Sequence, residues 1–260
     1  MTVLPLQISH SKPRTARLDQ ALVERGLCES REKAQRAILA GTVRVNEQLA
    51  RKPSDSVSTT DQITLAAPER FVSRGGCKLE HALDHFQIDP RGLTVVDLGA
   101  STGGFTDCLL QRGAKKVYAV DVGRGQLAWK LRKDSRVAVM EKTNARDLTP
   151  QRFDPPFTSA DLVVIDCSFI SLQKILPAAA GLVHSLGHII ALVKPQFEAG
   201  KSEADKGAGV ISDPSIHARV LREMEDFVRA HAGLIWRGCT ESPLLGPAGN
   251  KEFLMLLEKT

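Results

Sequence analysis

The stretch VVDLGASTGGFTDCLL, residues 95–110, constrains the fold more than any other part of the sequence. It opens with apolar, β-branched residues typical of a buried strand, continues with a glycine-rich turn, and ends in apolar residues at helical spacing. A strand, a turn and a helix in this order predict a βαβ unit whose turn lies at the carboxyl end of a parallel strand. Ligands bind at that end of such sheets, so the turn is the first candidate for a binding site.

Apolar strand candidates and helical stretches continue this alternation towards the C-terminus. The strand candidates lie at residues 94–98, 116–121, 137–140, 161–166, 188–193, 234–239 and 252–257, with helices expected at 173–183 and 215–232. Alternating strands and helices predict an α/β, Rossmann-like fold with a mostly parallel seven-stranded sheet covered on both faces.

Composition narrows the class of protein. No apolar run approaches the roughly 18 to 20 residues of a membrane-spanning helix, and the N-terminus lacks the pattern of a secretory signal. The five cysteines (Cys28, Cys77, Cys108, Cys167 and Cys239) are scattered and never form a C-x-x-C pair. We therefore expect a cytoplasmic protein with neither disulfides nor a metal site. The net charge of +5 suits a polyanionic partner, although many proteins without such a partner share it.

Residues 14–66 have the character of a separate, small α+β domain. Gly26 is expected to end a first helix, Ser30 to cap a second one with Glu32 in its first turn, and Gly41 to end that helix. The segments TVRVN and QITL predict short strands. A linker is expected at residues 67–73, followed by the larger domain at residues 74–260.

The small domain contains the pattern R-L-D-x-x-L-x-x-R-G-L-x-x-S-R-x-x-A-x-x-x-I-x-x-G-x-V-x-V-N. This pattern closely resembles the alpha-L RNA-binding domain of a small-subunit ribosomal protein and of pseudouridine synthases. Basic residues on an isolated helix usually form a solvated face, but the resemblance implies contact with structured RNA through the backbone and shape. The residues concerned are Arg17, Arg31, Lys33, Arg36 and Arg44.

Three ligands compete for the glycine-rich turn. A nucleoside triphosphate is disfavoured because the Gly-Lys-Ser/Thr motif is missing, and a dinucleotide is disfavoured because the glycines do not follow G-x-G-x-x-G. Asp97, expected at the mouth of the turn, would repel a pyrophosphate but suits the sulfonium and amino group of S-adenosylmethionine. The glycines are expected to admit this ligand close to the backbone.

S-adenosylmethionine would also explain the polar residues that follow the next two predicted strands. Asp121 is placed to accept hydrogen bonds from ribose hydroxyls, and Asn144 follows the third strand, where the adenine edge would lie. The alternative is that Asp97 and Asp121 only cap their own turns. The expected cofactor-binding residues are Asp97, Gly99, Ala100, Ser101, Gly103, Gly104, Phe105, Asp121 and Asn144.

The residues after the later strands indicate the methyl acceptor. The Asn/Asp-Pro-Pro-aromatic motif of base-nitrogen methyltransferases is absent, and Cys167 fits a core cysteine better than a cytosine-attacking nucleophile. A hydroxyl acceptor needs a group that takes its proton, and a lysine can serve if a second lysine nearby lowers its pKa. The candidates are Lys78, Asp166, Lys194 and Glu252, although each taken singly also fits an ordinary surface charge or salt bridge.

The motifs SRGGCKL, DLGASTGGFTDCLLQRGA, DCSFISL, LVKPQFE and GNKEF, behind an alpha-L domain, closely resemble the TlyA or hemolysin A family of ribosomal RNA 2′-O-methyltransferases. The resemblance implies an FtsJ-type, class I methyltransferase domain, S-adenosylmethionine as cofactor and ribosomal RNA or ribosomal subunits as partner. It also implies a Lys-Asp-Lys-Glu tetrad at Lys78, Asp166, Lys194 and Glu252, in which Lys194 deprotonates or orients the 2′-hydroxyl. In the family the acceptor is a cytidine ribose in large-subunit RNA and, in some members, also one in small-subunit RNA.

Residues 198–214 lack helical or strand periodicity, and we interpret them as a lid in which Lys201 and Lys206 contact phosphates; an ordinary solvated loop is the alternative.

A competing hypothesis for the whole chain is a non-catalytic, ribosome-associated RNA-binding protein with a relic methyltransferase domain. The membrane-lytic activity suggested by the older family name has no long amphipathic or apolar segment to support it. The sequence indicates no oligomeric state.

Overall fold

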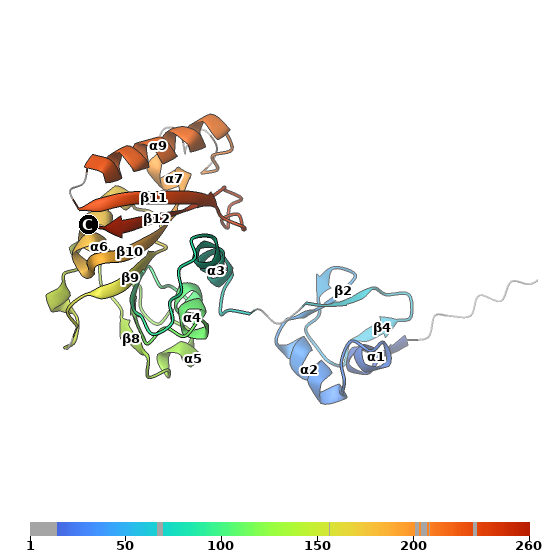
Figure 1. The fold of residues 1–260 in the computed structure, drawn as a ribbon. Helices are drawn as coiled ribbons and strands as arrows, with labels where there is room; N and C mark the ends of the chain where they lie inside the picture. Colours follow the sequence, from blue (N-terminus) through green and yellow to red (C-terminus); the bar gives the residue numbers. More distant parts are fainter. Residues whose placement is uncertain are drawn as a thin grey trace, which may run out of the picture. The chain divides into compact units, whose positions relative to one another are not determined.

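The computed structural model describes residues 15–66, 70–155, 157–200, 203, 207, 209–230 and 233–260. The chain divides into two compact units, with the division between Glu69 and Arg70. Figure 1 shows the elements of both units.

The first unit packs two helices against short strands. Its elements are β1 (Thr15–Arg17), α1 (Leu18–Glu24), α2 (Arg31–Leu39), β2 (Val43–Val45), β3 (Gln48–Leu49), β4 (Ser56–Ser58) and β5 (Ile63–Leu65). β1 pairs with β4, and β2 lies between β3 and β5. Leu18, Leu22 and Ile38 are fully buried and form the centre of the core.

The expected helix boundaries of the first unit are confirmed. Gly26 and Gly41 adopt positive φ angles of 70° and 73°, and the Ser30 hydroxyl accepts a hydrogen bond from the Lys33 backbone N–H at 3.2 Å. β2 and β5 lie in the predicted segments TVRVN and QITL, whereas the short strands β1, β3 and β4, each with at most one apolar residue, were not predicted.

The second unit is a sheet between two layers of helices. Its strands are β6 (Thr94–Leu98), β7 (Lys116–Val120), β8 (Val137–Met140), β9 (Ala160–Ile165), β10 (Val183–Val193), β11 (Leu234–Glu241) and β12 (Phe253–Lys259). Its helices are α3 (Gly75–His85), α4 (Gly104–Gln111), α5 (Trp129–Arg132), α6 (Leu176–Leu182), α7 (Pro195–Glu198) and α9 (Pro214–Ala230), with 3₁₀ turns η1 (Ala145–Asp147), η2 (Pro150–Arg152) and η3 (Leu172–Lys174).

The sheet has seven strands in the order β11-β12-β10-β9-β6-β7-β8, and only β12 runs antiparallel to its neighbours. α3, α4 and α5 pack on one face and α6 and α9 on the other (Figure 1). The predicted mostly parallel, seven-stranded α/β fold is therefore confirmed. The strand order reverses between β6 and β9, and a ligand crevice is expected at that point.

Several boundaries differ from the expected ones. The helix expected at residues 173–183 is a 3₁₀ turn followed by α6, because Pro177 lacks the N–H of a helix interior and sits in the first turn. β10 begins five residues before the expected strand, since its first part pairs irregularly with β9. Residues 70–73, expected as linker, are packed onto the second unit: Phe71 is buried, and the Val72 N–H donates to the Asp107 carboxylate at 2.8 Å.

Candidate active site

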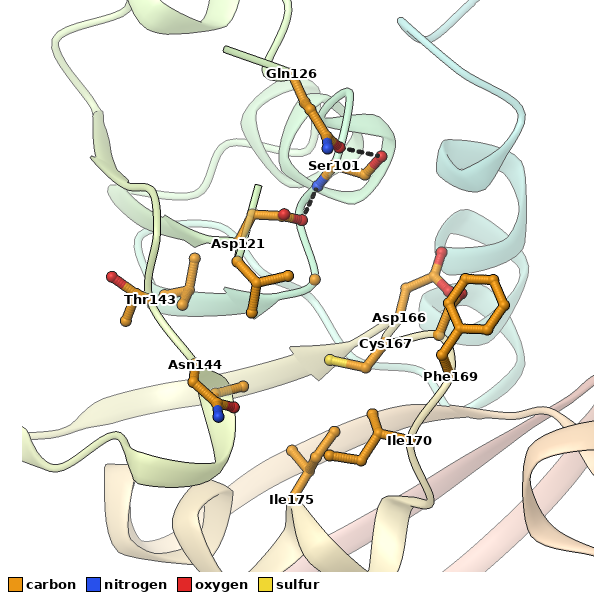
Figure 2. A pocket seen from close by; sticks show the side chains of 15 residues that line it. Ser101, Asp121, Gln126, Thr143, Asn144, Asp166, Cys167, Phe169, Ile170 and Ile175 are labelled. Carbon is orange, nitrogen blue, oxygen red and sulfur yellow. Dashed lines mark hydrogen bonds between the residues drawn. The ribbon is translucent and has the colours of Figure 1, made fainter. Parts of the chain in front are cut away.

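A cavity of about 480 Å³ opens at the carboxyl ends of β6, β7 and β9. Gly99, Asp121 and Asp166, which directly follow these three strands, contribute to its wall. Figure 2 shows Thr143 and Asn144 at one end of this cavity and Asp166 and Phe169 at the other. The strand reversal thus produces the crevice that the topology predicts, and we call it the strand-end cavity.

The polar part of this cavity is organised by Asp121. One carboxylate oxygen accepts the Ser101 backbone N–H at 2.8 Å, and the other accepts the Gly123 N–H at 2.6 Å. These bonds fix the carboxylate while it still lines the cavity, and its free lone pairs can accept further hydrogen bonds. Asn144 also lines the cavity, and its side chain caps η1 by accepting the Arg146 N–H at 3.1 Å.

The apolar part of the cavity suits a flat, uncharged ring system. Val120, Val122, Ile170 and Ile175 lie along its wall. Apolar walls, one fixed carboxylate and a site of this volume fit the nucleoside part of S-adenosylmethionine.

Gly99 is required by the packing of the protein itself. Its φ is 86°, and a Cβ at this position would lie 2.7 Å from the Asp166 carbonyl oxygen. Gly103 is similar, because its Cβ would lie 2.2 Å from the Leu131 side chain of α5. These two glycines therefore allow neighbouring segments to pack closely, a role that the expectation of ligand access to the backbone did not include.

Gly99→Ala is expected to displace the segment at Asp166 and lower cofactor affinity, while the strained φ costs about 1–3 kcal/mol of stability. Gly92→Ala is the matched control, because Gly92 has a φ of 78° but no atom within 4 Å of the added methyl group. Calorimetric titration with S-adenosylhomocysteine and urea unfolding measure the two effects. Equal cofactor affinity in the two variants would contradict this role of Gly99.

Asp97 does not lie at the mouth of the turn, as expected from the sequence. It is fully buried, accepts a hydrogen bond from the Thr106 hydroxyl at 2.6 Å, and its other oxygen has no hydrogen-bond partner among the described residues. The reason is the alternation of β6, in which Val95 and Asp97 face α3 and α4. Ala100, Gly103, Gly104 and Phe105 are also buried and do not line the strand-end cavity.

Burial raises the pKa of Asp97 to about 7, and the nearby Asp166 and Asp121 carboxylates act in the same direction. Because the folded pKa exceeds the unfolded one, the stability associated with the protonated form is lost as the pH rises towards 7. Relative to Asp97→Asn, the wild-type protein is expected to lose about 2 kcal/mol of unfolding free energy between pH 5.5 and 8.5. Denaturant unfolding at both pH values tests this, and parallel behaviour of the two proteins would contradict a protonated Asp97.

A second cavity, of about 350 Å³, adjoins the first and shares Ser168 and Phe169 with it. Lys194 and Glu252 line this second cavity, which we call the lysine cavity. Lys194 follows β10, and its Nζ donates to Asp166 Oδ1 at 2.6 Å and to Ser168 Oγ at 2.8 Å. Since Asp166 lines the strand-end cavity, this ion pair connects the two cavities.

The remaining two residues of the expected tetrad form a second ion pair. Lys78 of α3 donates to Glu252, which precedes β12, and both side chains are almost completely buried. The structure thus brings together residues that are 174 positions apart in sequence. Each of the two lysines thus has a carboxylate as its direct partner.

Sequence reasoning missed the residues that support this arrangement. Ser168 accepts a hydrogen bond from Lys194, and Phe169, a residue that is 91% exposed, lines both cavities. Glu198 of α7 accepts hydrogen bonds from the Ser171 hydroxyl and the Leu172 N–H, and desolvation raises the pKa of its carboxyl. Glu198 therefore connects the loop after β9 to the segment after Lys194. In the sequence, its place in the motif LVKPQFE was the signal that could have indicated this role.

Cys167 lines the strand-end cavity, but it is poorly suited to act as a nucleophile. Its Sγ donates to the Leu98 carbonyl oxygen at 3.5 Å, and burial raises the pKa of the thiol to about 12. A thiol with this pKa is almost entirely protonated at neutral pH, so the thiolate needed for attack on a base is scarce.

The expected RNA-binding residues of the first unit are exposed and have partners within the unit. Arg17 and Arg31 donate to the buried Asp19 at 3.0 and 2.9 Å, and the Arg17 guanidinium holds the pKa of that carboxyl well below its usual range. The other three have partners close by in the sequence. Lys33 and Arg36 form ion pairs with Glu29 and Glu32, and Arg44 donates a hydrogen bond to the backbone carbonyl of Glu47. Lys201 and Lys206 lie outside the described residues, as does most of the predicted lid before residue 207.

Two kinds of feature are absent from the described part of the chain. It contains no cluster of three or more His, Cys, Asp or Glu side chains arranged to hold a metal ion. None of its helices has the length and apolar character needed to cross a membrane.

Comparison with known proteins gives matches for both units. The sequence matches the FtsJ-like methyltransferase family at residues 71–259 and the S4 domain family at residues 16–63. The proposed rRNA methyltransferase YqxC of Bacillus subtilis is 50% identical over 242 residues, which cover 93% of this chain and 85% of that protein. The 16S/23S rRNA (cytidine-2'-O)-methyltransferase TlyA of Mycobacterium tuberculosis is 47% identical over 248 residues, or 94% of this chain and 90% of that protein.

A solved structure, described as a proposed hemolysin from Streptococcus thermophilus, is similar along nearly the whole chain. It has a TM-score of 0.72 and 44% sequence identity, and the match covers 96% of this chain and 90% of that chain. The family resemblance inferred from the motifs is confirmed by these matches.

Proposed function

The chain belongs to the FtsJ-like methyltransferase family, and on this premise we propose that it methylates the 2′-hydroxyl of a cytidine in ribosomal RNA. The observation that carries the proposal is the Asp166-Lys194 ion pair, which joins a cavity suited to a nucleoside cofactor to a second cavity lined by Lys194 and Glu252. The cytidine-2′-O-methyltransferase named among its relatives, 47% identical, supports this choice of acceptor.

The strand-end cavity is proposed to hold S-adenosylmethionine, which supplies a methyl group on a sulfonium when bound. Asp121 would accept hydrogen bonds from its ribose hydroxyls, and Asn144 lies where the adenine edge would be read. Asp166, at the opposite end of the cavity, adds negative charge where the sulfonium cation is expected. Asp97 is buried behind the cavity wall and contributes by holding the start of α4 through the Thr106 hydroxyl.

The lysine cavity is proposed to hold the ribose. An ammonium group has three N–H donors, and Lys194 uses two of them on Asp166 and Ser168. The third can hold the 2′-oxygen towards the methyl donor, and the hydroxyl proton passes to the Asp166 carboxylate as the new carbon-oxygen bond forms, because the ammonium has no lone pair to accept it. The Lys78-Glu252 pair fixes the far wall of the site.

Phe169 offers a surface for the base of the target nucleotide. Its ring is 91% exposed and lies 5.2 Å from that of Phe197, and its backbone has a φ of 64° that is rare for an aromatic residue. An exposed ring beside the acceptor cavity is suited to stack on an unpaired base.

Phe169→Ala is expected to raise KM for the RNA by about fivefold or more, because stacking of one base contributes about 1–3 kcal/mol. Phe169→Trp is expected to retain most of the affinity, since it keeps the aromatic face. Steady-state methylation assays separate KM from kcat. An unchanged KM in the alanine variant would remove Phe169 from substrate binding.

The S4 domain is proposed to dock structured ribosomal RNA through Arg17, Arg31, Lys33, Arg36 and Arg44. Their side chains are exposed, and Arg17 and Arg31 are held in place by the buried Asp19. A cytoplasmic location belongs to the same proposal, as do large-subunit RNA as the main substrate, small-subunit RNA as a second one to be tested, and Lys201 and Lys206 as further phosphate contacts. The domain boundaries proposed are residues 14–66 and 70–260, because Phe71 and Val72 pack onto the second unit.

The experiment is methyl transfer from labelled S-adenosylmethionine to isolated large and small ribosomal subunits. Ribose 2′-O-methylation blocks alkaline cleavage of the next phosphodiester, so the modified position appears as a gap in an alkaline ladder. Label in RNA with a gap at a cytidine is the expected result. Binding of subunits without any transfer of label would favour the alternative, a ribosome-associated protein with a relic methyltransferase domain.

A further inference from the structure

α5 and the loop before it expose a tryptophan among positive charges. Trp129 is 68% exposed, and Lys133 Nζ lies 4.8 Å from the centre of its ring. Tryptophan is highly buried on average, so a ring left in solvent beside a cation is an unusual use of this side chain.

The charge around Trp129 is largely unbalanced. Arg124, Lys133 and Lys142 are exposed and form no salt bridge among the described residues, although Arg124 lies near the Glu141 carboxylate. The neighbouring carboxylates are already used: Asp107 by Lys130, Glu141 by Arg132, and Asp134 by Arg136. A surface with free cations and neutralised carboxylates attracts a polyanion.

The two loops and the helix that carry these residues are connected beside the strand-end cavity. Glu141 joins the loop to α5, because it accepts the Gly125 N–H at 2.7 Å and also binds Arg132. Val122, Gln126 and Thr143, from the same two loops, line the strand-end cavity. We call the set Arg124, Trp129, Lys133 and Lys142 the α5 surface.

The α5 surface also lies next to the beginning of the methyltransferase unit. The Asp107 carboxylate accepts hydrogen bonds from both Lys130 of α5 and the Val72 backbone N–H, at 2.9 and 2.8 Å. None of the residues in the α5 surface belongs to the tetrad or to the S4 domain.

We propose that the α5 surface is a second RNA-binding surface, in which an unpaired base stacks on Trp129 and the flanking phosphates contact Arg124, Lys133 and Lys142. The proposal rests on the proposed function, which brings RNA to this unit. It is distinct from the acceptor site, because Phe169 and Lys194 lie at the other end of the strand-end cavity or beyond it. Aromatic rings interleaved with cations are the usual means of binding unpaired nucleotides.

The intrinsic fluorescence of Trp129 tests the stacking directly. The chain has two tryptophans, Trp129 and the partly buried Trp236, so Trp236→Phe leaves Trp129 as the only tryptophan, excited selectively at a wavelength where tyrosine does not absorb. Titration with a single-stranded RNA of about ten nucleotides is expected to quench the emission, with less quenching by a duplex of the same length. Binding seen by the anisotropy of a labelled RNA, without any change in Trp129 emission, would overturn the proposal.

Matched variants measure the contribution of the surface to affinity. Trp129→Ala is expected to weaken single-stranded RNA binding by about fivefold or more and Trp129→Phe by much less, while Lys133→Ala should lower the salt dependence by about one ion. Leu186→Ala is the control, because Leu186 is 70% exposed and lies in the irregular first part of β10, at the end of the strand opposite the cavity. Cofactor affinity, measured by calorimetry, is expected to stay unchanged in all four.

The outcomes separate this proposal from the proposed function. If Trp129→Ala binds RNA and ribosomal subunits as tightly as the wild-type protein while methylation continues, the proposed RNA binding by the α5 surface is wrong and the proposed function is retained. If RNA quenches the Trp129 emission and Trp129→Ala binds RNA weakly, but the wild-type protein transfers no methyl group, the proposed RNA-binding surface is supported and the proposed function is wrong.

Discussion

Lys194→Ala is expected to lower kcat for RNA methylation by about 10²- to 10⁴-fold, the range typical of assisted proton transfer, because the hydroxyl would no longer be held beside the Asp166 carboxylate. The physical reason is position: Lys194 Nζ is held by Asp166 and Ser168 at the junction of the two cavities. Single-turnover assays with saturating S-adenosylmethionine measure the chemical step. Cofactor affinity is expected to remain, since Lys194 does not line the strand-end cavity.

Lys115→Ala is the control for Lys194, because Lys115 is an exposed lysine in the turn before β7. Its variant is expected to react at the wild-type rate. If Lys194→Ala also kept the wild-type rate, the proposed mechanism would fail even if the protein methylated RNA.

Glu252→Ala is expected to have the largest effect on stability. Glu252 is 1% and Lys78 7% exposed, so removal of the carboxylate leaves a buried, unpaired ammonium. Breaking one partner of a buried ion pair typically costs about 3–5 kcal/mol, and the wall of the lysine cavity would be lost with it. Urea unfolding and methylation assays measure these two effects.

A double variant separates the two roles of this pair. Lys78→Met combined with Glu252→Leu removes both charges and fills the space with apolar atoms, which is expected to recover most of the stability. Methylation is expected to remain absent, because the polar wall of the acceptor site is gone. A wild-type unfolding free energy for Glu252→Ala alone would contradict the burial of the pair.

The fold could be predicted from the sequence because its determinants are local. The stretch at residues 95–110 combines a strand, a turn and a helix, and the later strands repeat the alternation. The antiparallel direction of β12 has no such local signal, since direction depends on which strands it pairs with.

The orientation of Asp97 shows why the site was harder to predict. β6 is buried on both faces, so its residues are apolar on both sides and the pattern does not reveal which face Asp97 occupies. The identity of the four tetrad residues came from motifs, whereas the pairing of Lys78 with Glu252 and of Lys194 with Asp166 depends on long-range packing. Ser168 and Phe169 lie in a short loop without periodicity, where no pattern distinguishes a ligand contact from a connecting residue.

The most direct test of the central proposal is the chemical identity of the modified nucleoside. Ribosomal RNA treated with the protein and S-adenosylmethionine would be digested to nucleosides and analysed by mass spectrometry, with Lys194→Ala as the paired sample. We expect 2′-O-methylcytidine from the wild-type reaction and almost none from the variant. Cytidine carrying the methyl group on its base, with an unmodified ribose, would contradict the proposal.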